Sequence, residues 1–142
     1  MSLDLETARS VIAATRAAGR SLDLRPLTVV VLDTGGHLIA AEREDGSSMS
    51  RFEIAHGKAY GALAFGLGSR ALMARAEQQP SFIAAASATI GGRLVPVPGG
   101  VLIRDEAGVL LGGIGVSGDS SDQDEKAALA GIESVHLVGD PG

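Results

Sequence analysis

The chain has 142 residues, of which 45% are hydrophobic and 3% aromatic, with no cysteine and a formal net charge of −5. The absence of cysteine excludes disulfides, thiolate metal sites and a cysteine nucleophile. An acidic chain without a basic run is not expected to bind nucleic acid, because phosphates need Lys and Arg partners. The longest apolar run, residues 27–32, is far too short to span a bilayer. Asp4 and Glu6 stand where an export signal would be basic, so we expect a cytoplasmic protein without a membrane partner.

The first half of the chain predicts a helix, a β-hairpin and a second helix. Apolar residues recur at helical spacing over residues 3–18. The β-branched run 27–32 is typical of a central strand that is covered on both faces. Residues 37–44 return antiparallel to it, after a glycine turn in which we expect Asp33 to bond its own turn amides. A second amphipathic helix follows over residues 50–67.

The second half predicts two short helices, extended segments that form a second antiparallel hairpin, and a last helix. These elements occupy residues 69–77, 82–88, 94–97, 101–103, 109–116 and 122–137. The element order predicts one α+β domain over residues 1–142, with an antiparallel sheet.

Two stretches of the C-terminal half have the spacing of known ligand sites. Gly113–Gly118 matches the dinucleotide fingerprint, but the residues that follow leave no room for the second strand and its ribose-binding acid. We expect these glycines to let a neighbouring element approach the strand closely. Residues 119–125 lack the glycine and the last glutamate of a calcium loop, and are typical of a capped helix N-terminus.

The central predicted helix carries a candidate ligand histidine. His56 lies three residues after Glu53 and four before Tyr60, so these three side chains share a helix face, whereas Phe52 is assigned to the buried stripe. A neutral imidazole held there is suited to haem iron or to general-base catalysis. The alternative is a partly exposed helical histidine without a ligand.

Lys58 and a glycine pair are further candidates. Lys58 lies among small residues, where burial would lower its pKa and suit it to base chemistry. The alternative is a structural ion pair with Glu44, Asp45 or the acids that open the last helix. The adjacent amides of Gly99 and Gly100 suit an anionic ligand group, although a plain turn is the alternative.

Several stretches together resemble a known family. They are residues 31–38, 42–46, 53–59, 95–100 and 112–118, followed by the acids Asp122, Asp124 and Glu125. Their order and spacing, over about residues 28–132, resemble the GlcG/HbpS family of haem-binding or haem-degrading-type domains. The resemblance implies a profilin-like α+β fold, with a central antiparallel sheet flanked by helices. It also implies a homo-oligomer and, for some relatives, binding of haem or work beside corrinoid enzymes.

The first functional hypothesis is a small-ligand binding protein, with a tetrapyrrole, haem or corrinoid, as the leading ligand class. In this hypothesis haem is the cofactor and His56 is its iron ligand. Arg43 and Lys58 hold its carboxylates, with Arg51 and Arg93 as other basic groups for the propionates.

Two alternatives stay open. One is a cofactor-independent enzyme that acts on a small organic acid or a ring-cleavage product. Lys58 and Glu53 would then do the acid–base work, and the Gly99 and Gly100 amides would stabilise developing negative charge. The other is a non-catalytic accessory subunit whose glycine-rich strands serve oligomer assembly.

Overall fold

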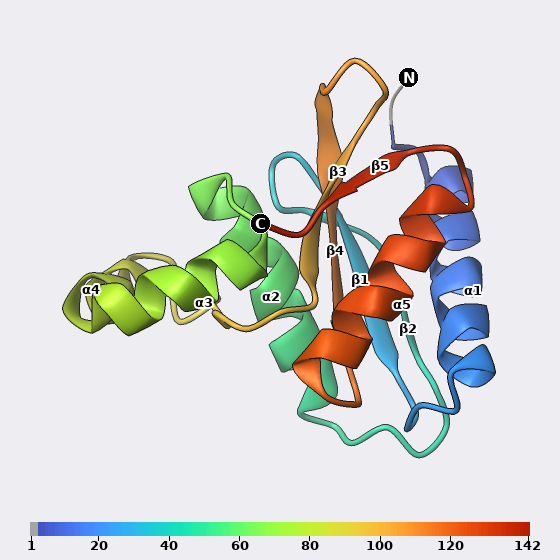
Figure 1. The fold of residues 1–142 in the computed structure, drawn as a ribbon, viewed down its shortest axis with the longest axis horizontal. Coiled ribbons are helices and arrows are strands. Elements are labelled where there is room, and N and C mark those ends of the chain that lie inside the picture. Colours follow the sequence, from blue (N-terminus) through green and yellow to red (C-terminus); the bar gives the residue numbers. More distant parts are fainter. Residues whose placement is uncertain (1–2) are drawn as a thin grey trace.

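The computed structural model describes residues 3–142, which form a five-stranded antiparallel sheet with helices on both faces (Figure 1). The helices are α1 (Leu5–Ser21), α2 (Arg51–Phe65), α3 (Ser69–Gln78), α4 (Pro80–Thr89) and α5 (Ser121–Glu133). The strands, in their order across the sheet, are β2 (Leu38–Arg43), β1 (Thr28–Asp33), β4 (Leu110–Ser117), β3 (Gly100–Arg104) and β5 (Val138–Asp140). Each neighbouring pair runs antiparallel. The predicted α+β fold, a central antiparallel sheet flanked by helices, is confirmed.

The sheet is covered on both faces, as the continuous apolar run of β1 predicts. Successive side chains of a strand point to opposite faces. Val29 and Val31 belong to the large core that α1 and α5 close, while Val30 and Leu32 belong to the smaller core beneath α2. The hairpin of α3 and α4 projects sideways from these layers, beyond the end of α2 (Figure 1).

Glycines in β4 let α2 lie directly on the sheet. A Cβ atom added at Gly115 would overlap the carbonyl oxygen of Ala55, whereas one added at Gly113 would meet the Leu63 side chain at 3.2 Å. Both positions belong to the stretch with dinucleotide-fingerprint spacing, and the expected close approach of a neighbouring element is confirmed. A side chain at Gly115 would push the two backbones apart.

The C-terminal region differs from the sequence-based prediction. The last helix was expected to run to residue 137, but α5 ends at Glu133. His136 then has a φ of 61°, in the left-handed region. After a helix this conformation is usually adopted by glycine or asparagine. Because a histidine adopts it here, the sequence gives no signal that the helix has ended. The following residues form β5, a strand that the sequence analysis missed, beside β3. Residues 94–97 form a loop instead of the expected extended pairing segment.

Two polar features have the structural roles that the sequence predicts. Asp33 Oδ1 accepts hydrogen bonds from the backbone N–H groups of Gly35 and His37, each at 2.9 Å, and so closes the first hairpin turn. Ser120 Oγ accepts one from Gln123 N at 3.3 Å and caps α5. Within residues 3–142, no group of three or more His, Asp or Glu side chains is placed to hold a metal ion.

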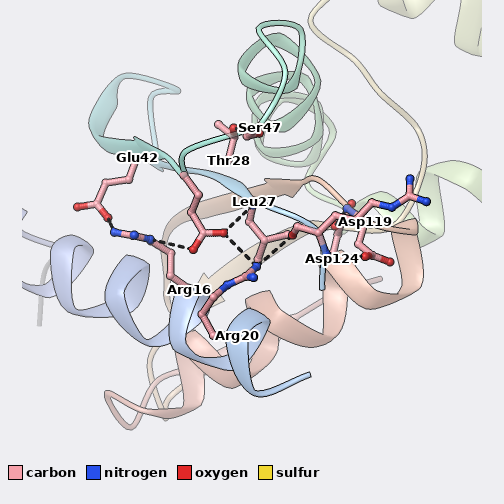
Figure 2. A network of polar contacts seen from close by, with 10 residues as sticks. Arg16, Arg20, Leu27, Thr28, Glu42, Ser47, Asp119 and Asp124 are labelled. Carbon is pink, nitrogen blue, oxygen red and sulfur yellow. Dashed lines mark hydrogen bonds and ion pairs between the residues drawn. The ribbon is translucent and has the colours of Figure 1, made fainter. Parts of the chain in front are cut away.

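The carboxylate of Glu44, which follows β2, accepts hydrogen bonds from two arginines of α1 and so links this helix to the sheet (Figure 2). Glu44 is 9% exposed, and it accepts hydrogen bonds from Leu27 N at 2.7 Å and from Arg16 and Arg20 at 3.2 Å each. Arg16 also pairs with Glu42 at 2.6 Å. Glu44 was one of the acids considered as a partner for Lys58, but its partners are these two arginines and a backbone N–H.

The glycine contacts predict unequal costs for two alanine substitutions in the same strand. Gly115→Ala should lower the free energy of unfolding by about 2–3 kcal/mol, since overpacking against rigid backbone costs this much. Gly113→Ala should cost clearly less, because the Leu63 side chain can shift. Urea denaturation of both variants measures the difference, and equal costs would contradict the proposed contact of α2 with β4.

Candidate functional site

A buried ion pair joins α2, β4 and α5. Lys58 Nζ donates to Asp124 Oδ2 at 3.0 Å and to the carbonyl oxygen of Val116 at 2.8 Å. The two charged side chains are 2% and 1% exposed. Asp124 Oδ1 also accepts a hydrogen bond from Asp119 N at 2.9 Å. Lys58 therefore has the structural ion pair considered for it, with an acid from the first turn of α5.

Burial weakens the charged form of both partners. Loss of water lowers the pKa of Lys58, and the nearby Asp124 carboxylate opposes this effect. Burial likewise raises the pKa of Asp124, and the Lys58 ammonium opposes that shift. Each charge therefore depends on the other, because a lone buried charge costs far more than a paired one.

The glycine pair lies against this ion pair. A Cβ atom at Gly99, whose φ is 121°, would lie 2.8 Å from Lys58 Nζ. Gly100 N donates to Ser69 Oγ at 2.7 Å, and the Gly99 carbonyl accepts from Val116 N at 3.0 Å. The structure thus brings Gly99, Gly100 and Lys58 together in the interior. Their contact with a ligand stays a prediction, and the observed contacts are structural.

Two other predicted site residues lie apart from Lys58. Glu53 is exposed, and no hydrogen bond or ion pair within residues 3–142 joins it to Lys58. Arg43 is exposed at the end of β2, where its Nη1 donates to the carbonyl oxygen of Ser47 at 2.8 Å. An acid–base role for Lys58 and Glu53 stays a prediction, but the geometry does not favour it because Lys58 is enclosed.

A row of rings runs along the outer side of α2. The centroids of Phe52 and His56 are 5.9 Å apart, and those of His56 and Tyr60 are 5.6 Å apart. These residues are one helical turn from each other, so their side chains align along one face. Arg93 completes the row with its guanidinium 4.0 Å from the centroid of Tyr60. Phe52, 37% exposed, joins this row, and its assignment to the buried stripe was wrong.

His56 is half-buried in the middle of this row. Partial burial lowers its pKa below the ordinary 6.5, and the positive charge of Arg93 acts in the same direction while Glu53 opposes them. The imidazole is therefore neutral at pH 7, which is the form that binds a metal ion. The other two histidines of the chain, His37 and His136, are exposed in loops.

A hollow of about 80 Å³ lies beside the last ring of the row. It is lined by Thr34, Gly35, Gly36, Tyr60, Leu63 and Ala64. The first hairpin turn forms one wall, and a Cβ atom at Gly36 would lie 2.8 Å from the Tyr60 ring. This space admits a small group at most, so a larger planar ligand would lie along the open face of the ring row.

The sequence signal for the ring row on α2 is stronger than the signal for the Lys58–Asp124 pair. The i, i+4, i+8 spacing of Phe52, His56 and Tyr60 is visible in the sequence, although the sequence-based prediction placed Phe52 on a different face. Arg93 reaches Tyr60 only because the loop after α4 crosses α2, where the Leu94 side chain packs on Gly61. The sequence offered several acids near the start of the last helix as partners for Lys58. Only the tertiary fold shows that Asp124 is the partner.

The fold and the site define a small α+β protein with an antiparallel sheet between helical layers, a buried Lys–Asp pair and a row of rings along one helix. The chain belongs to the HbpS-like family. The sequence-family model described as "Haem degrading protein HbpS-like" matches residues 3–133. The family predicted from the resemblance is confirmed. None of the curated proteins compared with the chain matches it.

Three solved structures illustrate the similarity. A PduOC:heme complex is 24% identical, with a TM-score of 0.85 over 96% of this chain and 97% of that chain. A double mutant of HbpS from Streptomyces reticuli is 27% identical, with a TM-score of 0.79 over 95% and 88%. Protein ORFY of Klebsiella pneumoniae is 23% identical, with a TM-score of 0.80 over 91% and 87%.

Among the helices of residues 3–142, none combines the length and the apolar character that crossing a bilayer requires.

The buried pair predicts a strongly non-additive double mutant. Lys58→Met should lower the free energy of unfolding by about 3–5 kcal/mol, because it leaves Asp124 buried without its counter-charge. Lys58→Met combined with Asp124→Leu should recover much of that loss. Urea denaturation measures both. Arg9→Met, which removes an exposed pair with Glu6, is the control and should change stability little. Additive costs would contradict a coupled pair.

Proposed function

We propose that the protein binds a tetrapyrrole, with haem as the leading candidate, on the face of α2 that carries Phe52, His56 and Tyr60. The observation that carries this proposal is a half-buried imidazole, neutral at pH 7, between two aromatic rings. Membership of a family described as haem degrading supports it. So does the structural similarity to a protein crystallised as a haem complex.

The residues around His56 fit the chemical parts of haem. His56 would supply the imidazole ligand to iron, and the neighbouring rings would contact the apolar macrocycle. Arg93, at the end of the row, would hold a propionate, since guanidinium pairs well with carboxylate. Arg43 and Arg51 make other contacts, to Ser47 and Ser117, and are weaker candidates for this task. Bound haem would supply iron-centred ligand and electron chemistry.

We also propose that a second copy of this chain covers the open side of the bound ligand. Phe52 is 37% exposed and Met49, nearby in the sequence, is 88% exposed. Burial of such apolar side chains between two copies would close a site that one copy leaves open. A cytoplasmic homo-oligomer without cysteine is the form in which we expect the protein to act.

A haem titration with two histidine variants tests the role of His56. The unaltered protein should give a saturable, shifted Soret band at one haem per chain or per two chains. His56→Ala should abolish this band or weaken binding at least tenfold, whereas His37→Ala, which removes an exposed loop histidine, should not change it. Equal behaviour of the two variants would remove His56 as the ligand. A parallel titration with a corrinoid tests the other tetrapyrrole class.

The lowered pKa of His56 predicts the pH profile of haem binding. Only the neutral His56 ring coordinates iron. Because the pKa of His56 lies below 6.5, the neutral ring predominates from pH 8 down to pH 6.5. Haem affinity should therefore be flat between pH 8 and 7 and should fall only below the pKa of His56. Absorbance titrations at a series of pH values measure this profile. His37→Ala should retain it, and a fall that begins above pH 7 would contradict it.

A further inference from the structure

A second polar hollow lies where the loop between β2 and α2 meets the chain that enters α5. Its volume is about 180 Å³, and its walls include Arg25, Gly46, Ser47, Ser48, Arg51 and Gly118. It shares no lining residue with the hollow beside Tyr60. We propose that this hollow binds a small oxyanion, namely the carboxylate or phosphate group of a small metabolite.

Two arginines, Arg25 and Arg51, line this hollow. Arg51 is half-buried, and its Nη1 donates to Ser117 Oγ at 3.1 Å, which orients the planar group. Within residues 3–142, neither Arg25 nor Arg51 forms an ion pair. Arginine presents five N–H donors in a plane that matches carboxylate and phosphate oxygens. The pair therefore offers unused donors at the wall of an open space.

Arg43 adds a third positive charge to the same loop. It also forms no ion pair within residues 3–142, and its hydrogen bond to the Ser47 carbonyl holds it against the loop that lines the hollow. By contrast, the arginines of the adjacent hollow, Arg16 and Arg20, are both paired with Glu44. Three arginines without an ion pair within residues 3–142 are thus found at this loop and hollow.

The carboxylate of Asp119, next to the lining residue Gly118, accepts hydrogen bonds from two backbone N–H groups. Asp119 accepts hydrogen bonds from Arg25 N at 2.9 Å and from Ser120 N at 2.8 Å. These backbone donors hold its pKa below the usual value, and the charges of Arg25 and Arg51 add to this effect. Asp119 therefore stays ionised and neutralises only part of the local positive charge.

The size of the hollow limits the ligand. Pockets for drug-sized molecules measure roughly 300–1,000 Å³, so a space of about 180 Å³ suits a small anion and not a tetrapyrrole. Gly46 and Gly118 contribute no side chains to its walls, and a Cβ atom at Gly118 would overlap the Pro26 carbonyl oxygen. Ser48, whose hydroxyl lies 3.4 Å from that of Ser50, also lines the hollow.

Amide NMR spectra of the haem-free protein test this site, with inorganic phosphate and succinate as probes at ionic strength fixed by NaCl. Phosphate, succinate or both should produce saturable shifts of the Gly46, Ser47, Ser48 and Gly118 amide signals. The probe with the lower Kd identifies the anion class. Arg25→Gln and Arg51→Gln should each raise Kd at least about tenfold, as expected for loss of a charge-assisted hydrogen bond. Arg75→Gln on α3, another arginine without an ion pair within residues 3–142, should leave Kd unchanged.

Three results would overturn the proposal. These are no saturable shift at the four amides with either probe, a Kd unchanged in both Arg25→Gln and Arg51→Gln, or an equal loss in Arg75→Gln. Arg51→Gln also removes the hydrogen bond to Ser117. If that variant does not fold, Arg25→Gln decides the test, because the Arg25 side chain forms no hydrogen bond within residues 3–142. Because the probes are used without haem, the result is independent of the tetrapyrrole proposal.

Discussion

The Lys58 ammonium has almost no contact with water, and its hydrogen-bond partners tie together elements from both sides of the sheet. The helix α2 brings it to the sheet, β4 supplies a carbonyl oxygen, and α5 supplies the Asp124 carboxylate. An unpaired charge in this position would cost several kcal/mol, so arrangements of the three elements that separate the two charges are disfavoured. The first turn of α5 thereby fixes the loop of residues 118–120, and with it one wall of the arginine-lined hollow.

Glycine residues let α2 lie close enough to β4 for Lys58 to reach its partners. Lys58 reaches Val116 only because α2 lies directly on β4, and that approach requires Gly115 beneath Ala55 and Gly100 beneath the Lys58 backbone. The chain has few aromatic residues to fill wide interlayer spaces, and its small residues bring the backbones together instead. Of its rings, Phe52 and Phe82 are exposed, whereas Tyr60 and Phe65 pack against the edges of the smaller cores.

Local patterns predicted the elements and the sheet because each carried its own signal. The β-branched run of β1, the turn at Asp33 and the acids at the start of α5 point to one structure each. The pattern failed where a single backbone angle decides, as at His136, and where a long-range contact decides, as for the partner of Lys58. The Phe52–His56–Tyr60 row was partly visible in the spacing. The arginine-lined hollow was not, because its walls come from loops distant in the sequence.

The net charge of −5 says little about what either candidate site binds, because the arginines differ in whether a carboxylate pairs with them. Arg16, Arg20 and Arg70 form ion pairs with carboxylates, whereas Arg25 and Arg51 line an open hollow and form no ion pair within residues 3–142. Coulomb interactions between exposed charges are largely screened beyond about 8–10 Å. A bound anion therefore senses the nearby guanidinium groups far more than the distant acids. An acidic protein can thus hold an anionic group, a propionate beside Arg93 or a small oxyanion beside Arg51.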